Sequence, residues 1–319
     1  MHLGIDLGGT KIEIIAMDTN STTLLRERCT TPQGDYKKTL DAICQIIYDT
    51  EQKLQQVGSL GIGIPGTISK ETGLIKNANS TCLIGKPLKE DLSKRLQRPV
   101  SVANDADCFT LSEACDGAGE QYNNVFGIIL GTGVGGGISI NKNIINGPNS
   151  ITGEWGHNPL PWINKRDFAL PCYCGKQACI ETFLSGPGIS KQFERLSLIN
   201  SDDSNIALTL KSEEIFKLSQ SGHSLALECV NRYIDQMARS LASVINILDP
   251  DVIVFGGGLS NIDHLYPKVH VKLQDYIFSD SVNTKFVKAL HGDSSGVRGA
   301  AWLGKSQHSI SSITKGKNI

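Results

Sequence analysis

The stretch HLGIDLGGTKIEIIAMD, residues 2–18, predicts how this chain begins to fold. Runs rich in apolar residues on both sides of Gly8 and Gly9 are typical of two β-strands joined by a tight turn. Glycines at such a turn adopt backbone conformations closed to other residues and bring N–H groups close to an anion. Thr10 adds a hydroxyl, Lys11 a cation, and Asp6 a carboxylate suited to Mg²⁺ through water. A plain hairpin turn explains the stretch equally well when it is taken alone.

A second glycine-rich turn repeats this pattern. LGTGVGGG, residues 130–137, again lies between two strand-like runs, and ILGTG echoes DLGGT. A purely structural turn would not need so many glycines, because each one adds to the entropy lost on folding. With FGGG at 255–258 as a third glycine-rich strand end, the pattern favours nucleotide-phosphate binding. The segment GTGVGG does not fit the dinucleotide-binding fingerprint, because a strand follows it where a helix is required.

The segment VANDAD, residues 102–107, places two polar side chains where a strand gives way to a helix. Asp105 at this position would direct a carboxylate into a cleft beside the positive end of the helix. Asn104 and Asp105 are also good N-caps, and capping is the simpler explanation when the segment is taken alone.

Three cysteines gather in PCYCGKQACIE, residues 171–181, and a histidine precedes them in GEWGH. Cys172, Cys174 and Cys179 with His157 supply three thiolates and one nitrogen, a set that suits a structural, tetrahedral Zn²⁺. All four ligands would come from the protein, which leaves no open position for catalysis. Free thiols are the alternative; the C-x-x-C motif of thioredoxin-like chemistry is absent.

Length and composition restrict the classes of protein to consider. The chain has 319 residues, more than one hydrophobic core usually serves, so two domains are expected. Helices are predicted near residues 36–57, 87–97, 106–117 and 223–248. A net charge of −1 does not favour binding to nucleic acid or to an anionic membrane. Without a signal peptide or an apolar span, we expect a cytoplasmic protein whose nine cysteines are reduced.

Taken together, these motifs resemble the ROK family of sugar kinases, within the actin/hexokinase/Hsp70-like fold. The resemblance covers nearly the whole chain and rests on an ordered series of segments: GIDLGGTK (4–11), GIGIPG (61–66), NANST (77–81), ANDAD (103–107), LGTGVGGG (130–137), GEWGH (153–157), CYCGKQACIE (172–181), DPDVIVFGGGLSN (249–261) and HGDSSGVRGAA (291–301). One departure is Ala178, which stands where the zinc loop of the family usually has glycine.

The resemblance implies an α/β fold of two actin-like (ribonuclease H-like) lobes with an interlobe cleft and a zinc-binding loop. The lobes would comprise residues 1–118, completed by a C-terminal helix at about 293–307, and residues 119–292, with the zinc loop at 157–179. A homodimer is also expected.

The resemblance also implies roles for individual residues, with ATP, Mg²⁺ and structural Zn²⁺ as cofactors. Asp105 would be the general base that takes a proton from a sugar hydroxyl. The sugar would be bound by Gly66, Asn79, Asn104, Glu154, His157 and Glu181. ATP would be bound by Gly4, Ile5, Asp6, Leu7, Gly8, Gly9, Thr10 and Lys11, by Gly131, Thr132, Gly133, Val134, Gly135, Gly136, Gly137 and Ile138, and by Gly256, Gly257 and Gly258.

Bacterial fructokinases resemble the chain most among family members, because of NANST and EWGHNPLPW. Fructose, converted to fructose 6-phosphate, is therefore the first expectation. We also expect the two prolines and Trp162 of NPLPW to leave little room for an N-acetyl group. The alternatives are a kinase of N-acetylhexosamines, glucose or mannose in the same family. A sugar-sensing repressor is disfavoured, because the first predicted strand begins at residue 2 without a helix-turn-helix before it. A non-catalytic sugar-binding protein is disfavoured by the presence of both Asp6 and Asp105.

Overall fold

The protein is described here from a computed structural model, which covers residues 1–78, 80–200 and 209–315. Within these residues it is an α/β protein with two five-stranded sheets and one two-stranded sheet. Residue contacts divide the chain into two compact units. The first comprises Met1–Asn123, Gly137–Gly153 and the chain from Leu290 onward; the second comprises Asn124–Gly136 and Glu154–Ala289. The predicted lobe boundaries at residues 118 and 292 stay predictions.

The first unit is built on a sheet with the strand order β3-β2-β1-β4-β7. Its strands are β1 (His2–Leu7), β2 (Lys11–Met17), β3 (Thr23–Thr30), β4 (Ser59–Ile64) and β7 (Val100–Asn104). The first three are antiparallel neighbours, and β4 and β7 continue the sheet in parallel with β1. The predicted hairpin and its third strand are confirmed.

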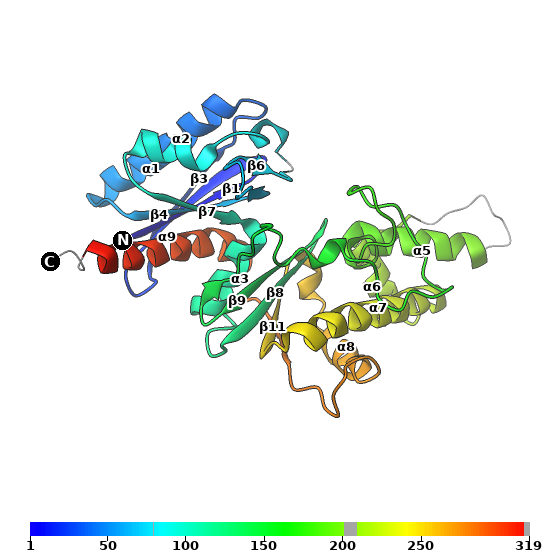
Figure 1. Cartoon of the computed structure of the whole chain (residues 1–319). Helices are drawn as coiled ribbons and strands as arrows, with labels where there is room; N and C mark the ends of the chain where they lie inside the picture. The colour runs from blue at the N-terminus through cyan, green and yellow to red at the C-terminus, as the bar shows by residue number, and fades with distance from the viewer. Residues whose placement is uncertain (79, 201–208, 316–319) are drawn as a thin grey trace. The chain divides into compact units, whose positions relative to one another are not determined.

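Helices lie on both faces of this sheet. Figure 1 shows α1 and α2 on one face and α9 on the other. The helices of the unit are α1 (Tyr36–Leu54), α2 (Leu88–Leu96), α3 (Asp105–Asp116) and α9 (Ser295–Lys315), with the short turns η1 (Thr81–Leu83) and η4 (Gly292–Ser294). Its short strands are β5 (Thr67–Ile68), β6 (Ile75–Lys76) and β10 (Asn143–Ile144).

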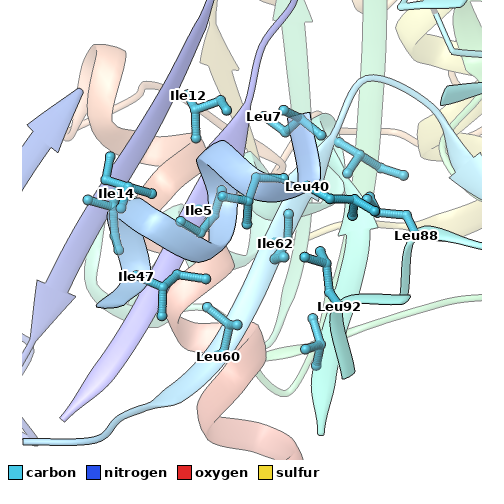
Figure 2. Close-up of a cluster of buried hydrophobic side chains, with 14 of the residues drawn as sticks. Ile5, Leu7, Ile12, Ile14, Leu40, Ile47, Leu60, Ile62, Leu88 and Leu92 are labelled. Carbon is cyan, nitrogen blue, oxygen red and sulfur yellow. The ribbon is translucent and has the colours of Figure 1, made fainter. Parts of the chain in front are cut away.

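The core of the first unit lies between the sheet and the helices α1 and α2. Because side chains alternate along a strand, Ile5 and Leu7 of β1 point to the same face. There they meet side chains from both helices, among them Leu40 of α1 and Leu88 of α2 (Figure 2). The helical period places Leu40, Ile43 and Ile47 on the buried side of α1.

Helix α9 packs against the opposite face of the sheet with its backbone close to the strands, because glycines of the sheet face the helix. A Cβ atom at Gly4 would lie 2.1 Å from the carbonyl oxygen of Val297, and one at Gly61 would lie 1.9 Å from that of Ala300. Both distances are far below van der Waals contact. The approach of α9 to β1 and β4 therefore requires that these two residues have no side chain.

The other five-stranded sheet has the strand order β10-β9-β8-β11-β12. The second unit contains its strands β8 (Asn124–Leu130), β11 (Val252–Gly256) and β12 (Lys285–Lys288), and the start of β9 (Val134–Ile140), whose residues from Gly137 on belong to the first unit. The helices and turns of the second unit are η2 (Trp155–His157), α4 (Glu181–Leu184), α5 (Gly186–Asn200), α6 (Ser212–Gln220), α7 (Ser224–Leu248), η3 (Gly258–Asn261) and α8 (Leu265–Leu273). The long helix predicted at 223–248 is confirmed as α7, against which α5, α6 and α8 pack.

No helix among the described residues is long and apolar enough to span a membrane.

Substitution of Gly61 tests the contact between α9 and the sheet. We expect Gly61→Ala to lower the free energy of unfolding by about 1–3 kcal/mol, because the added methyl group must push α9 away. Denaturant titration measures the change. Gly147→Ala is the control, since the nearest atom to its Cβ would be Thr152 Oγ1 at an ordinary 3.6 Å. Equal stability of the two variants would contradict the close-packing argument.

Candidate functional site

The β1–β2 turn of the first unit is held by the segment that follows β3. The Gly8 amide donates to the Lys11 carbonyl at 3.0 Å, which closes the turn. The Thr31 hydroxyl donates to the Gly8 carbonyl at 2.8 Å, and the Thr31 amide to the Thr10 carbonyl at 3.0 Å. These hydrogen bonds hold the turn in place, which suits a phosphate-binding loop.

Asp6 lies next to this turn in a setting that disfavours its charge. Burial, followed by the charges of Asp105 and Glu13, raises the pKa of Asp6 to about 6, while Lys11 and Arg28 act in the opposite direction. A Cβ at Gly296 would lie 3.6 Å from Asp6 Oδ2, so the carboxylate faces the first turn of α9. A helix N-terminus favours a negative charge and offsets part of this cost. Two carboxylates close enough to repel each other could together hold a cation.

A buried charge cluster beside Asp6 was missed in the sequence. Glu13 lies on β2, where it pairs with Asp6 of β1 on one side and with Arg28 of β3 on the other. Its buried carboxylate accepts a hydrogen bond from Arg28 Nε at 2.6 Å and another from Arg26. The sequence signal was a glutamate inside the apolar run KIEIIAM, since a buried carboxylate needs cationic partners. The charge of Arg28 in this cluster acts on Asp6 and lowers its pKa.

Asn104 and Asp105 lie at the start of α3, as predicted. Asn104 is the N-cap: its Oδ1 accepts from the Ala106 amide at 2.8 Å, and its Nδ2 donates to the Gly66 carbonyl at 3.1 Å. The structure thus brings together Asn104 and Gly66, two residues predicted to bind sugar. Asp105 keeps access to solvent, but protein atoms surround it, and this desolvation raises the pKa of its carboxyl. Asn79 lies outside the described residues.

In the second unit, the turn between β8 and β9 meets two segments that are distant in sequence. Glu181 Oε2 accepts from the Val134 amide at 2.9 Å, and Trp155 Nε1 donates to the Gly135 carbonyl at 2.9 Å. A Cβ at Gly156 would lie 2.2 Å from the Val134 carbonyl oxygen. The glycine turn, η2 and the start of α4 are therefore in direct contact. Trp155 was not predicted to take part.

The third glycine segment lies at the same edge of this sheet. β11 runs parallel to β8, with Gly256 opposite Ile129. Gly257 has a φ of 80°, and a Cβ there would lie 2.4 Å from the Leu130 carbonyl oxygen. The carboxyl ends of β8 and β11 therefore place two of the predicted ATP-binding segments side by side.

Some predicted ATP-binding residues have structural reasons for their identity. The side chains of Ile5 and Leu7 belong to the hydrophobic core, and Gly4 packs on α9. A Cβ at Gly137 would lie 2.5 Å from Thr110 Oγ1, so this glycine packs on α3. Core packing accounts for the identity of these four residues, and their assignment to ATP binding stays a prediction.

His157, Cys172, Cys174 and Cys179 form one cluster in the second unit. One ligand atom from each lies within 4.8 Å of the others. Cys172 Sγ is 3.6 Å from His157 Nδ1, and Cys174 Sγ is 3.7 Å from Cys179 Sγ. Zinc bonds of about 2.3 Å to sulfur and 2.0–2.1 Å to nitrogen would separate tetrahedral ligands by about 3.5–3.8 Å. The four residues therefore fit a tetrahedral zinc ion.

Two neighbours of this cluster add detail that the sequence did not. Ala178 has a φ of 56°, the left-handed conformation that glycine adopts at lower cost. Backbone hydrogen bonds to Leu160 and Leu170, both at 2.9 Å, hold it there. Tyr173, which was not predicted to take part, has its hydroxyl 2.9 Å from His157 Nε2.

Elemental analysis tests the metal cluster. We expect about one zinc per chain, because the donor set and spacings fit that ion. Cys179→Ala should lose the metal and lower the melting temperature, since structural zinc is coupled to folding. Cys44→Ala, which removes a thiol elsewhere, should keep the metal. Metal-free protein with an unchanged melting temperature would contradict the assignment.

Asp6→Asn tests how much the charge of Asp6 lowers the free energy of unfolding in the absence of ligands. Because the folded pKa of Asp6 is raised from 3.8 to about 6, this one group costs no stability below pH 3.8, and its cost grows as the pH rises to about 6. At pH 7 the variant should be more stable by about 1–3 kcal/mol, and near pH 4 the difference should be small. Denaturant titration across this range is the measurement. Asp49→Asn on α1 serves as control, and a wild type that gains stability between pH 4 and 6 relative to Asp6→Asn would contradict the prediction.

Comparisons with known proteins agree with this architecture. The model of the ROK family matches residues 2–307. An N-acetyl-D-glucosamine kinase of Salmonella gallinarum is 41% identical over 308 residues, which make up 95% of this chain and 99% of that protein. A ROK hexokinase from Thermus thermophilus has a TM-score of 0.81 at 25% identity, covering 97% of this chain and 99% of the other. A ROK family glucokinase from Streptomyces griseus, solved with glucose and AMPPNP, shares the fold with a TM-score of 0.72 at 24% identity, covering 96% and 99%. The chain belongs to the ROK family.

Proposed function

We propose that the protein is an ATP-dependent sugar kinase whose preferred substrate is N-acetylglucosamine. The observation that carries this proposal is 41% identity, over 95% of the chain, to an N-acetyl-D-glucosamine kinase. The ROK hexokinase and the glucokinase with bound glucose and AMPPNP share its fold, in agreement with a sugar kinase. The expectation of fructose has no such support among these relatives, and the N-acetylhexosamine alternative takes its place.

The contacts of Trp162 also give no support to the physical argument for fructose. That argument required Trp162 to narrow the sugar pocket and exclude an N-acetyl group. Instead, the Trp162 ring stacks on the Tyr276 ring, with their centroids 5.4 Å apart, and Trp162 is 55% exposed. Buried Arg239 donates to the carbonyls of Pro161 and Trp162, both at 3.0 Å, and holds the loop on α7. The bulk of Trp162 is thereby committed to the contact with Tyr276.

In the first unit, the proposed chemistry centres on Asp105. Its carboxylate would take the proton of the sugar hydroxyl as that oxygen bonds to the γ-phosphorus of ATP, while the bond from this phosphorus to the leaving ADP oxygen breaks. Phosphoryl transfer depends more on positioning and charge neutralisation than on a strong base. Asp6 would hold Mg²⁺ through water, and the ion would supply charge neutralisation. Asn104 and Gly66, joined by a hydrogen bond, would orient the sugar.

In the second unit, the proposed roles divide between phosphates and sugar. The turn Gly131–Gly136 would bind ATP phosphates through backbone N–H groups, and Gly256–Gly258 would lie against the adenosine. Glu154, His157 and Glu181 would hydrogen-bond the sugar. The metal cluster would fix His157 and, through Cys179, the start of α4. The Glu181 carboxylate also accepts a hydrogen bond from the Val134 amide, at the end of the glycine turn. The loop that carries His157 and Glu181 would therefore help to orient both the sugar and ATP.

Substrate selectivity tests the proposal. With saturating ATP and Mg²⁺, we expect kcat/KM for N-acetylglucosamine to exceed that for fructose by at least about tenfold, since sites that pair buried polar groups with a substrate discriminate strongly. A coupled assay of ADP release over fructose, glucose, mannose and N-acetylated hexosamines measures it.

Asp105→Asn is the matched control, because it keeps the size and polarity of the side chain. It should lower kcat by roughly 10²–10⁴, the usual contribution of a positioned base, while sugar binding persists. Fructose as the best substrate would reject the sugar assignment alone. An absence of ADP release with every sugar would reject the kinase.

A further inference from the structure

Tyr173 has a contact that neither the metal cluster nor the proposed catalytic residues explain. It lies between two of the clustered cysteines and is 80% exposed. Nevertheless its hydroxyl is 2.9 Å from His157 Nε2, and its ring meets the imidazole edge-on with centroids 5.1 Å apart. An exposed tyrosine has many rotamers available, so this one is held by its contact with His157.

The two nitrogens of His157 face different partners. Nδ1 faces Cys172 Sγ at 3.6 Å and is therefore the nitrogen directed into the cluster. A neutral imidazole that gives the lone pair of one nitrogen to a metal carries its proton on the other. With a metal on Nδ1, His157 Nε2–H would donate to the Tyr173 oxygen, and the tyrosine's own proton would be available for donation to another group.

The Tyr173 hydroxyl meets the nitrogen that the proposed function leaves for a sugar hydroxyl. With Nδ1 directed into the cluster, Nε2 is the nitrogen of His157 that remains for the sugar. The Tyr173 oxygen lies 2.9 Å from it, which is hydrogen-bond distance. A single N–H group serves one such hydroxyl well, so the tyrosine and the sugar would compete for it.

We propose that the Tyr173 hydroxyl occupies the position of one sugar hydroxyl on His157 in the sugar-free protein and leaves when the sugar binds. This inference rests on the proposed function for the identity of the ligand. In this exchange a sugar hydroxyl replaces the Tyr173 hydroxyl as the partner of His157 Nε2. The released Tyr173 side chain is then solvated by water. Tyr173 thereby sets the apparent affinity for sugar without taking part in phosphoryl transfer.

The test compares Tyr173→Phe, which removes only the hydroxyl, with the wild type. Calorimetric titration with N-acetylglucosamine in the absence of ATP should show a Kd about two- to fivefold lower in the variant, within the range of one ordinary hydrogen bond in competition with water. KM should fall by the same factor with kcat unchanged, and zinc content should stay the same. Tyr48→Phe, at an exposed tyrosine on α1, should change none of these values.

Monodeoxy analogues of N-acetylglucosamine sharpen the test. The tighter binding by Tyr173→Phe should disappear for the one analogue that lacks the hydroxyl displacing the tyrosine. A higher Kd in the variant would mean that Tyr173 binds the sugar directly, and an unchanged Kd would mean that it does not compete. Either result overturns the inference.

A readout without sugar separates this inference from the proposed function. In nitrogen-15 NMR of the sugar-free protein, the His157 Nε2–H signal should exchange faster with water in Tyr173→Phe than in the wild type or Tyr48→Phe. An unchanged exchange rate would overturn the inference even if the protein phosphorylates sugar. Failure to phosphorylate any sugar would reject the function, while faster exchange would still establish the hydrogen bond.

Discussion

Both units position their candidate residues by bringing main chain against main chain at distances that only glycine permits. In the first unit, Gly4 and Gly61 let α9 approach the sheet so closely that its first turn reaches Asp6. In the second, Gly156 brings η2 onto the turn at Val134, and Gly257 lies on the end of β8. Backbone is stiffer than side chains, so functional groups held in this way have little freedom to move. In the proposed function, this constraint would supply the positioning on which phosphoryl transfer depends.

The metal cluster extends this rigidity to a loop with little regular structure. The segment between η2 and α4 is held by isolated backbone bridges and by the cluster itself. Two of the spacings between ligand atoms, 3.6 and 3.7 Å, match those of a tetrahedral zinc ion. His157 and Glu181 stand at the two ends of this loop. A single ion would therefore fix two side chains proposed to meet the sugar.

Electrostatics at Asp6 oppose stability and would favour the cation of the proposed function. Desolvation and two neighbouring carboxylates raise the pKa of the half-buried Asp6 carboxyl, yet Lys11 and Arg28 prevent a larger rise. Arg28 is in turn paired with Glu13 at 2.6 Å. A site that is too negative without a ligand gains most when a cation binds, because the cation removes the repulsion. The same arrangement explains why Asp6 should cost stability in the protein without ligands.

The sequence by itself determined the features that depend on local pattern. Strand alternation and glycine pairs predicted the hairpin at residues 2–18, the helical period predicted α7, and residue type predicted the ligands Cys172, Cys174, Cys179 and His157. Only the tertiary structure decided which residues meet across the chain. It placed Glu13 beside Arg28, set Tyr173 on His157, and assigned Gly137 to packing on α3 and Trp162 to Tyr276. Local patterns reflect backbone geometry within a few residues, whereas these contacts depend on strand register and side-chain packing between segments that the sequence keeps apart.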